Sequence, residues 1–88
     1  MATQQATHQV GITPAALRAM QDSGQEWDFF FGMHLNGICS EEDRRHNLEA
    51  AAQGEPLVTT FRTLKGRDLL VVTDKERSLT TILLPEER

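Results

Sequence analysis

Residues 57–84 read LVTTFRTLKGRDLLVVTDKERSLTTILL, and this stretch decides the fold. Apolar and polar side chains alternate through much of it, and β-branched residues are frequent, as is typical of strands. Lys65-Gly66 suits a two-residue hairpin loop, and Asp74-Lys75-Glu76-Arg77 suits a second, four-residue turn. The stretch therefore predicts an antiparallel meander of three strands, at 57–64, 67–73 and 78–84.

The two turns also predict which side chains share a face of this sheet. Threading the chain through them pairs Phe61 with Leu70, and Leu70 with Thr81. One face then carries Leu57, Phe61, Leu70, Val72, Leu79 and Leu83, and the other carries Val58, Leu69, Val71, Ile82 and Leu84. Both faces are largely apolar, so helices that cover one face leave the other for a partner or for a further helix.

Helical signals fill the chain upstream of the meander. Thr13 with Pro14, the pair Ser23 and Glu26, and Ser40 each resemble the start of a helix. The pattern predicts helices over residues 14–22, 24–35 and 41–53. An alternative for the second segment is a buried strand, because three Phe residues follow one another there.

The second predicted helix supplies the aromatic part of the core. Trp27, Phe31 and Leu35 recur every four residues and so form one stripe. We expect the main core residues to be Trp27, Phe31, Phe61, Leu70 and Val72. The fold class is thus α+β, with two to three N-terminal helices followed by a three-stranded antiparallel meander. Residues 12–88 form one domain, and residues 1–11 form a flexible N-terminus.

Composition and charge exclude several classes of function. Nine Lys and Arg against thirteen Asp and Glu give a net charge of −4, and all of the acidic excess lies in residues 1–55. This sign disfavours nucleic acid and suits a basic protein surface, although an acidic excess also simply keeps small proteins soluble. No apolar run is long enough for a membrane span, and the N-terminus does not resemble a signal peptide. One cysteine permits no intrachain disulfide, so we expect a cytoplasmic protein.

The candidate reactive groups are His8, His34, His46 and Cys39. Three of them lie in the pattern His34-x4-Cys39-x6-His46, which offers zinc-type ligands but lacks the close pairs of structural zinc sites. Cys39 precedes a helix N-terminus, where a thiol can become reactive. The simpler interpretation is a bystander thiol and ordinary histidines. We therefore expect no catalytic residue, no metal and no cofactor.

The remaining features favour a non-enzymatic protein-binding module. A small bacterial or phage-type inhibitor, an antitoxin-like protein or an adaptor would occlude a partner's surface with its acidic helix start and its second apolar face. The predicted partner-binding residues are Glu41, Glu42, Asp43, Val58, Leu69, Val71, Ile82 and Leu84. We also expect a homodimer, formed over this face or along the edge of the strand at 78–84, which carries no charge.

An alternative function comes from the order of the elements. Helices followed by a three-stranded antiparallel sheet resemble the RelE-like family of small ribonuclease toxins. The resemblance implies an enzyme acting on RNA, in which Arg62, Arg67 and one histidine contact phosphates. The basic side chains that could contact RNA or another anion lie on or near the two turns, at Arg62, Lys65, Arg67, Lys75 and Arg77.

Overall fold

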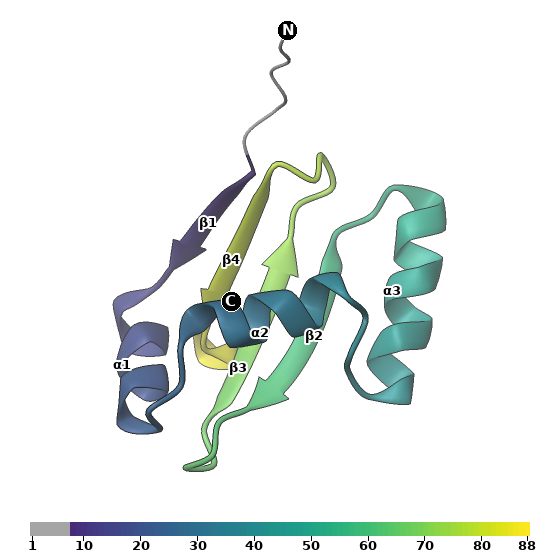
Figure 1. Ribbon diagram of the computed structural model, residues 1–88. Helices are drawn as coiled ribbons and strands as arrows, with labels where there is room; N and C mark the ends of the chain where they lie inside the picture. Colours follow the sequence, from purple (N-terminus) through teal and green to yellow (C-terminus); the bar gives the residue numbers. More distant parts are fainter. Residues whose placement is uncertain (1–7) are drawn as a thin grey trace, which may run out of the picture.

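A computed structural model describes residues 8–88 of the chain (Figure 1). Its elements are β1 (Gln9–Ile12), α1 (Pro14–Asp22), α2 (Trp27–Leu35), α3 (Glu41–Gln53), β2 (Leu57–Arg62), β3 (Asp68–Thr73), β4 (Leu79–Leu83) and the 3-10 turn η1 (Pro85–Glu87). The predicted α+β class is confirmed, because three helices precede an antiparallel meander of β2, β3 and β4.

One strand was not predicted. β1 pairs in parallel with β4, so the sheet has the order β1-β4-β3-β2 and is mixed. The predicted flexible terminus at 1–11 is therefore wrong for residues 9–11, and residues 1–7 lie outside the described residues. β1 holds only two large apolar residues, Val10 and Ile12, so its own sequence gives almost no strand signal. The edge of β4 supplies its hydrogen-bond partners.

Two predicted helix starts are confirmed and one is wrong. Thr13 and Ser40 cap α1 and α3 through their side-chain oxygens. Ser23, however, ends α1, and α2 begins only at Trp27 without a side-chain cap. The Ser23 hydroxyl instead accepts a hydrogen bond from the backbone amide of Lys65. The loop between α1 and α2 therefore holds the β2–β3 hairpin through Ser23. The Ser23 hydroxyl is then not available to cap α2.

The strand register differs from the prediction by one residue in the first hairpin. Phe61 pairs with Leu69 rather than Leu70, because the loop has three residues, Leu64–Gly66, instead of two. Gly66 has a φ of 88°, which is the left-handed conformation that such a three-residue loop requires. A slip of one residue moves every side chain of a strand to the other face. The second hairpin is shifted by two residues, so its faces are unchanged.

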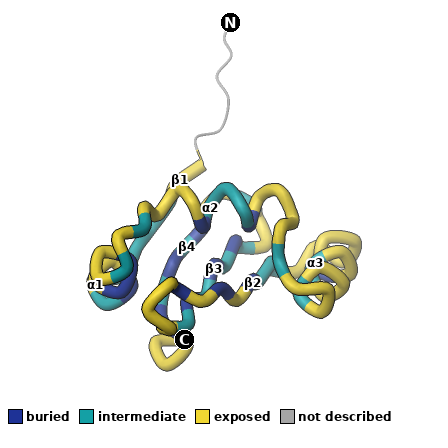
Figure 2. Tube along the Cα trace, turned by 60° about the horizontal axis from the view of Figure 1, so that its bottom comes forward, coloured by how far each residue is buried: buried dark blue, intermediate teal, exposed yellow. Residues whose placement is uncertain are grey.

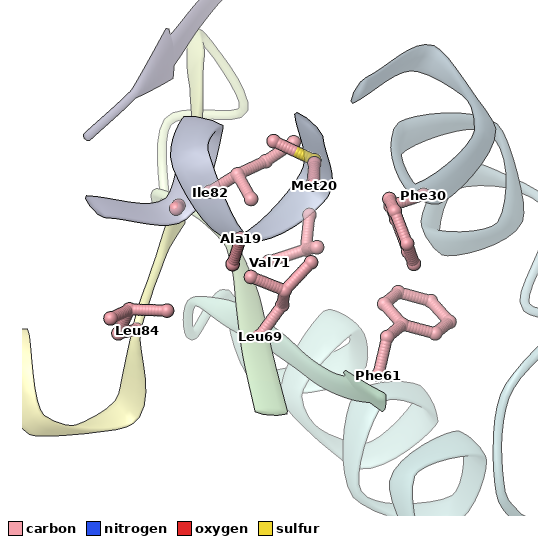
Figure 3. Close-up of a cluster of buried hydrophobic side chains, with 9 residues drawn as sticks. Ala19, Met20, Phe30, Phe61, Leu69, Val71, Ile82 and Leu84 are labelled. Carbon is pink, nitrogen blue, oxygen red and sulfur yellow. The ribbon is translucent and has the colours of Figure 1, made fainter. Parts of the chain in front are cut away.

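The core lies between the sheet and the first two helices. α1 contacts β4 and α2 contacts β3. The buried apolar cluster consists of Ala16, Ala19, Met20, Phe30, Phe61, Leu69, Val71, Ile82 and Leu84 (Figure 3). The rings of Phe30 and Phe61 are 5.8 Å apart and join α2 to β2. This contact fixes the side of α2 that faces the sheet.

Of the five core residues expected from the sequence, only Phe61 belongs to this cluster. Trp27 is 37% exposed, and Phe31 is half-buried beside it. Leu70 and Val72 point to the opposite face of the sheet and are half-buried there. The changed register and a different rotation of α2 explain these errors together.

Helix α3 protects the outer edge of β2 rather than covering a face. The Asp43 carboxylate accepts a hydrogen bond from the Thr60 amide at 2.9 Å, and the Asn47 side-chain oxygen accepts one from the Val58 amide at 2.8 Å. Asp43 and Asn47 are one helical turn apart, so both reach the same strand. The Val58 and Thr60 amides, which an edge strand would otherwise offer to another chain, are thus occupied.

We predict that Asn47→Ala lowers the free energy of unfolding by about 1–3 kcal/mol, because it leaves the Val58 amide without an acceptor and removes one of the two hydrogen bonds of the Thr59 hydroxyl. Urea denaturation followed by circular dichroism measures this change. The matched control is Glu49→Ala on the same helix, which should change stability by less than about 0.5 kcal/mol. Equal effects of the two substitutions would show that α3 does not hold β2.

Candidate functional site

Helix α2 lies across one face of the sheet (Figure 1), and several large apolar side chains in and just after it are exposed. Phe30 and His34 point inward and are buried, as their spacing of four residues requires. On the outward side Phe29 is 51% exposed and Leu35 is 58% exposed. Ile38, just after the helix, is also 58% exposed. Large apolar side chains gathered in this way mark an interaction surface more often than they occur by chance.

Gly32 lies at the centre of this surface. It follows Phe29 by three residues and precedes Leu35 by three, so both neighbours lie one turn away on the same side. Its φ is not positive, and an added Cβ would meet no heavy atom within 4 Å among the described residues outside its own helical surroundings. Glycine inside a helix costs about 1 kcal/mol relative to alanine. The described part of the fold therefore gives no reason for glycine here.

We call Phe29, Gly32, Leu35 and Ile38 the α2 face. Sequence reasoning missed it because α2 carries large apolar residues all around, so periodicity does not reveal which side faces the sheet. The one histidine of α2, His34, determines which side of the helix faces the sheet. His34 points inward because two threonines on the sheet satisfy both of its ring nitrogens. A histidine within an apolar helix, opposite strands rich in threonine, was the available signal.

The predicted apolar partner-binding residues lie elsewhere than expected. Leu69, Val71, Ile82 and Leu84 are buried in the core beneath the helices, so their assignment to an exposed face is wrong. A charge at Ile82 would therefore disrupt the core rather than separate two subunits. The edge of β4 is also occupied, because β1 pairs with it. A dimer along that edge would therefore require β1 to leave it.

Val58 is the exception among these apolar residues and lies on the other face of the sheet. The helices among residues 8–88 leave this outer face uncovered, and only the C-terminal turn lies on this side (Figure 2). Its aliphatic residues are Val58, Leu70, Val72, Leu79 and Leu83. Most of them are half-buried, so this face offers less apolar surface than the α2 face does.

The three predicted acidic residues have separate roles. Glu41 and Glu42 are exposed at the start of α3, whereas Asp43 holds the Thr60 amide. A groove of about 670 Å³ runs between α3 and the beginning of β2. The charged or titratable side chains that line it are Glu42, Asp43, His46, Glu49, Glu55 and Arg88. It is acidic overall, in agreement with the charge of this half of the chain.

The five basic residues do not form one patch. The two hairpin turns lie at opposite ends of the sheet, which separates Arg62, Lys65 and Arg67 from Lys75 and Arg77 (Figure 1). Arg62 pairs with Asp68 at 3.0 Å, and Arg67 with Glu86 at 3.6 Å. Arg77 donates to the backbone oxygens of Glu55 and Asp74. The arginines named for RNA contact are thus engaged within the chain.

The predicted reactive groups also remain apart. Cys39 is half-buried against the core, and its thiol lies 3.7 Å from the Gly37 oxygen. His46 is exposed on α3, whereas His34 is buried. Across residues 8–88 no three histidine, cysteine or acidic side chains lie close enough together to hold a metal ion. The ligand set considered from the spacing is therefore not assembled in this part of the chain.

His34 and His8 instead belong to one chain of hydrogen bonds beneath α2. His34 Nδ1 lies 2.8 Å from Thr59 Oγ1, and His34 Nε2 lies 2.8 Å from Thr73 Oγ1. Thr73 Oγ1 is 2.8 Å from Thr80 Oγ1, which is 2.7 Å from His8 Nε2. His8 Nδ1 reaches the Arg77 backbone oxygen at 3.1 Å. The chain thus links α2, β2, β3, β4 and the start of β1.

At each end of this series of hydrogen bonds lies a group that can act there only as a donor or only as an acceptor. The Val58 amide donates to Asn47 Oδ1, so Asn47 Nδ2 donates to Thr59, and the Arg77 carbonyl can only accept. One arrangement of protons then satisfies every member. Thr59 donates to His34, His34 Nε2 to Thr73, Thr73 to Thr80, and Thr80 to His8. Both imidazoles are neutral in this arrangement.

Burial lowers the pKa of His34 below its ordinary value of 6.5, and the positive charge of a protonated His8 lowers that pKa further. The unfolded chain therefore binds a proton at His34 more readily than the folded chain does. The contribution of His34 to stability is fully present above pH 6.5 and is lost as the pH falls below that value.

Comparisons of this chain with models of protein families, with curated proteins and with solved structures returned no match. Within residues 8–88 the helices are too short or too polar to span a bilayer.

Proposed function

We propose that this protein is a non-enzymatic binding module of the inhibitor, antitoxin-like or adaptor kind, and that it docks on protein through the α2 face. The exposed apolar side chains around Gly32 carry this proposal. Aromatic and aliphatic anchors surrounded by polar surface are the usual centre of a protein interface.

Gly32 indicates how closely a partner approaches. A glycine in the middle of an exposed helix face lets another backbone come nearer than any side chain would allow. Phe29 and Leu35 would then flank the contact on either side. This arrangement gives a physical reason for a residue that weakens the helix and that the described residues do not otherwise require.

A second copy of the chain is the occupant that this surface suits best. Phe29 and Leu35 are placed symmetrically about Gly32, three residues before it and three after it. A two-fold axis near Gly32 would cross two α2 helices and bring Phe29 of each copy against Leu35 of the other. Two-fold interfaces use the same patch twice in this way. The proposed partner is therefore a second copy of this chain, provided that no other protein competes for the α2 face.

Gly32→Ala tests this role because two expected effects have opposite signs. Alanine should raise the stability of the isolated subunit by about 0.5–1 kcal/mol, since its Cβ meets open space and alanine favours a helix. The same methyl group should weaken self-association by about tenfold or more, because it separates the crossing helices. Urea denaturation in dilute solution measures the first effect, and sedimentation equilibrium measures the second.

The control substitution is Ala51→Gly on the exposed side of α3, which changes helix propensity without touching the α2 face. It should lower stability by about 1 kcal/mol and leave association unchanged. If Gly32→Ala stabilised the subunit and left association equally strong, Gly32 would not lie at the interface.

A further inference from the structure

We propose that the hydrogen-bonded histidine–threonine chain is an acid-sensitive latch that holds strand β1 on the sheet at neutral pH and releases it when His8 is protonated. The latch joins His8, at the start of β1, to Thr80 on β4 and to the turn carbonyl of Arg77. β1 has four residues and a strand partner on only one side, so its sheet pairing depends on β4 alone.

The direction of the chain makes His8 a switch. Neutral His34 donates to Thr73, which obliges Thr73 to donate to Thr80 and Thr80 to donate to His8. Protonated His8 carries a proton on Nε2 and can no longer accept there. One threonine hydroxyl then loses its acceptor: that of Thr80, that of Thr73 if their bond reverses, or that of Thr59 if His34 also changes tautomer. All three threonines are buried, so water does not replace that acceptor while β1 stays in place.

Among residues 8–88, no carboxylate pairs directly with the new charge on His8. In the part of the chain that the structure describes, neither imidazole is hydrogen-bonded to an acidic side chain. The Asp74 carboxylate, in the turn next to His8, is bonded by Ser78 and the Leu79 amide, and the Arg77 guanidinium lies in the same turn. Asp43 on α3 is bonded to the Thr60 amide. The ring of Phe31 on α2 packs beside the His8 ring, with 5.9 Å between the two ring centroids. Asp28, in the first turn of α2, is exposed.

Movement of β1 relieves the conflict because it carries the exposed ring of His8 away from the Thr80 hydroxyl. His34 is enclosed and cannot escape in this way, and its lowered pKa keeps it neutral as the pH begins to fall. Release also uncovers the edge of β4, which has no charged residue from Leu79 to Leu83. A sheet edge of this kind is prone to pair with another strand.

Hydrogen exchange detected by NMR tests the latch on the whole chain, at about pH 7.5 and about pH 5. The reporter is the Gln9 amide, which donates to the Ser78 oxygen across the β1–β4 pair. After correction for intrinsic rates, its protection should fall by about tenfold or more at the lower pH, while amides of the β2–β3 pair keep theirs. The midpoint should coincide with the titration of the His8 ring signals.

The matched variants are His8→Gln and His46→Gln. Glutamine offers an acceptor and a donor but takes up no proton, so His8→Gln should abolish the acid response of Gln9. His46 is exposed on α3 and takes no part in the histidine–threonine hydrogen bonds, so His46→Gln should leave the response intact. If His8→Gln already frees β1 at neutral pH, the wild-type comparison decides whether the latch exists: the midpoint for loss of Gln9 protection must then coincide with the titration of the His8 ring signals. Protection of Gln9 that persists with His8 protonated, or that is lost together with the β2–β3 amides, overturns the proposal.

Discussion

Phe30→Ala should lower the free energy of unfolding by about 3–5 kcal/mol. The ring is 1% exposed and contacts Phe61 across the α2–sheet interface. Its removal takes away buried apolar area and leaves a cavity that the surrounding side chains fill only in part. For a domain of this size such a loss is a large share of the total stability. Urea denaturation of the isolated subunit, in dilute solution, measures it.

Leu35→Ala on the same helix is the control for this result. Leu35 is 58% exposed, so its truncation should cost the isolated subunit less than about 1 kcal/mol. The difference between the two variants reports the rotation of α2 about its own axis. A larger effect at Leu35 than at Phe30 would mean that the helix presents its other side to the sheet, and the α2 face would then be part of the core.

Leu35→Asp should weaken self-association by about 100-fold or more. In the proposed dimer the side chain of Leu35 packs against Phe29 of the other copy, away from water. A carboxylate placed there would be desolvated without a partner. In the isolated subunit the same carboxylate points to solvent, so the fold should remain intact. Circular dichroism should therefore show an unchanged spectrum while association is lost.

Much of the fold was predictable because local signals and tertiary structure agree. Thr13 and Ser40 cap helices where their side chains predict caps. The alternation from Leu57 onward predicts the meander, which the structure confirms. In these places the backbone needs nothing from distant residues to choose its conformation. Local propensity then suffices.

The errors arise where distant contacts decide. Ser23 prefers the amide of Lys65 over a capping role, and β1 exists only through the edge of β4. One extra residue in the first hairpin loop exchanged the two faces of β2 relative to β3, so Leu69 shares the core face with Phe61, whereas Val58 lies on the other face. Register errors of this kind are severe because strand side chains have a period of two.

The candidate site was less accessible to sequence reasoning than the fold. The rotation of α2 depends on His34 finding Thr59 and Thr73, which come from two different strands. Once that rotation is known, Phe29, Gly32 and Leu35 stand out on the opposite side. From the sequence alone, these three residues look like part of a helix that is buried on all sides.

Sedimentation velocity of the wild type, of Leu35→Asp and of Leu64→Asp, at the same concentration, tests the docking role of the α2 face most directly. Leu64 is 81% exposed in the β2–β3 hairpin, outside that face, and so provides a matched change of charge and hydrophobicity. The account predicts twice the subunit mass for the wild type and for Leu64→Asp, and the mass of a single subunit for Leu35→Asp. A wild type that sediments as a single subunit at high concentration, or a Leu35→Asp variant that still sediments as a dimer, would contradict it.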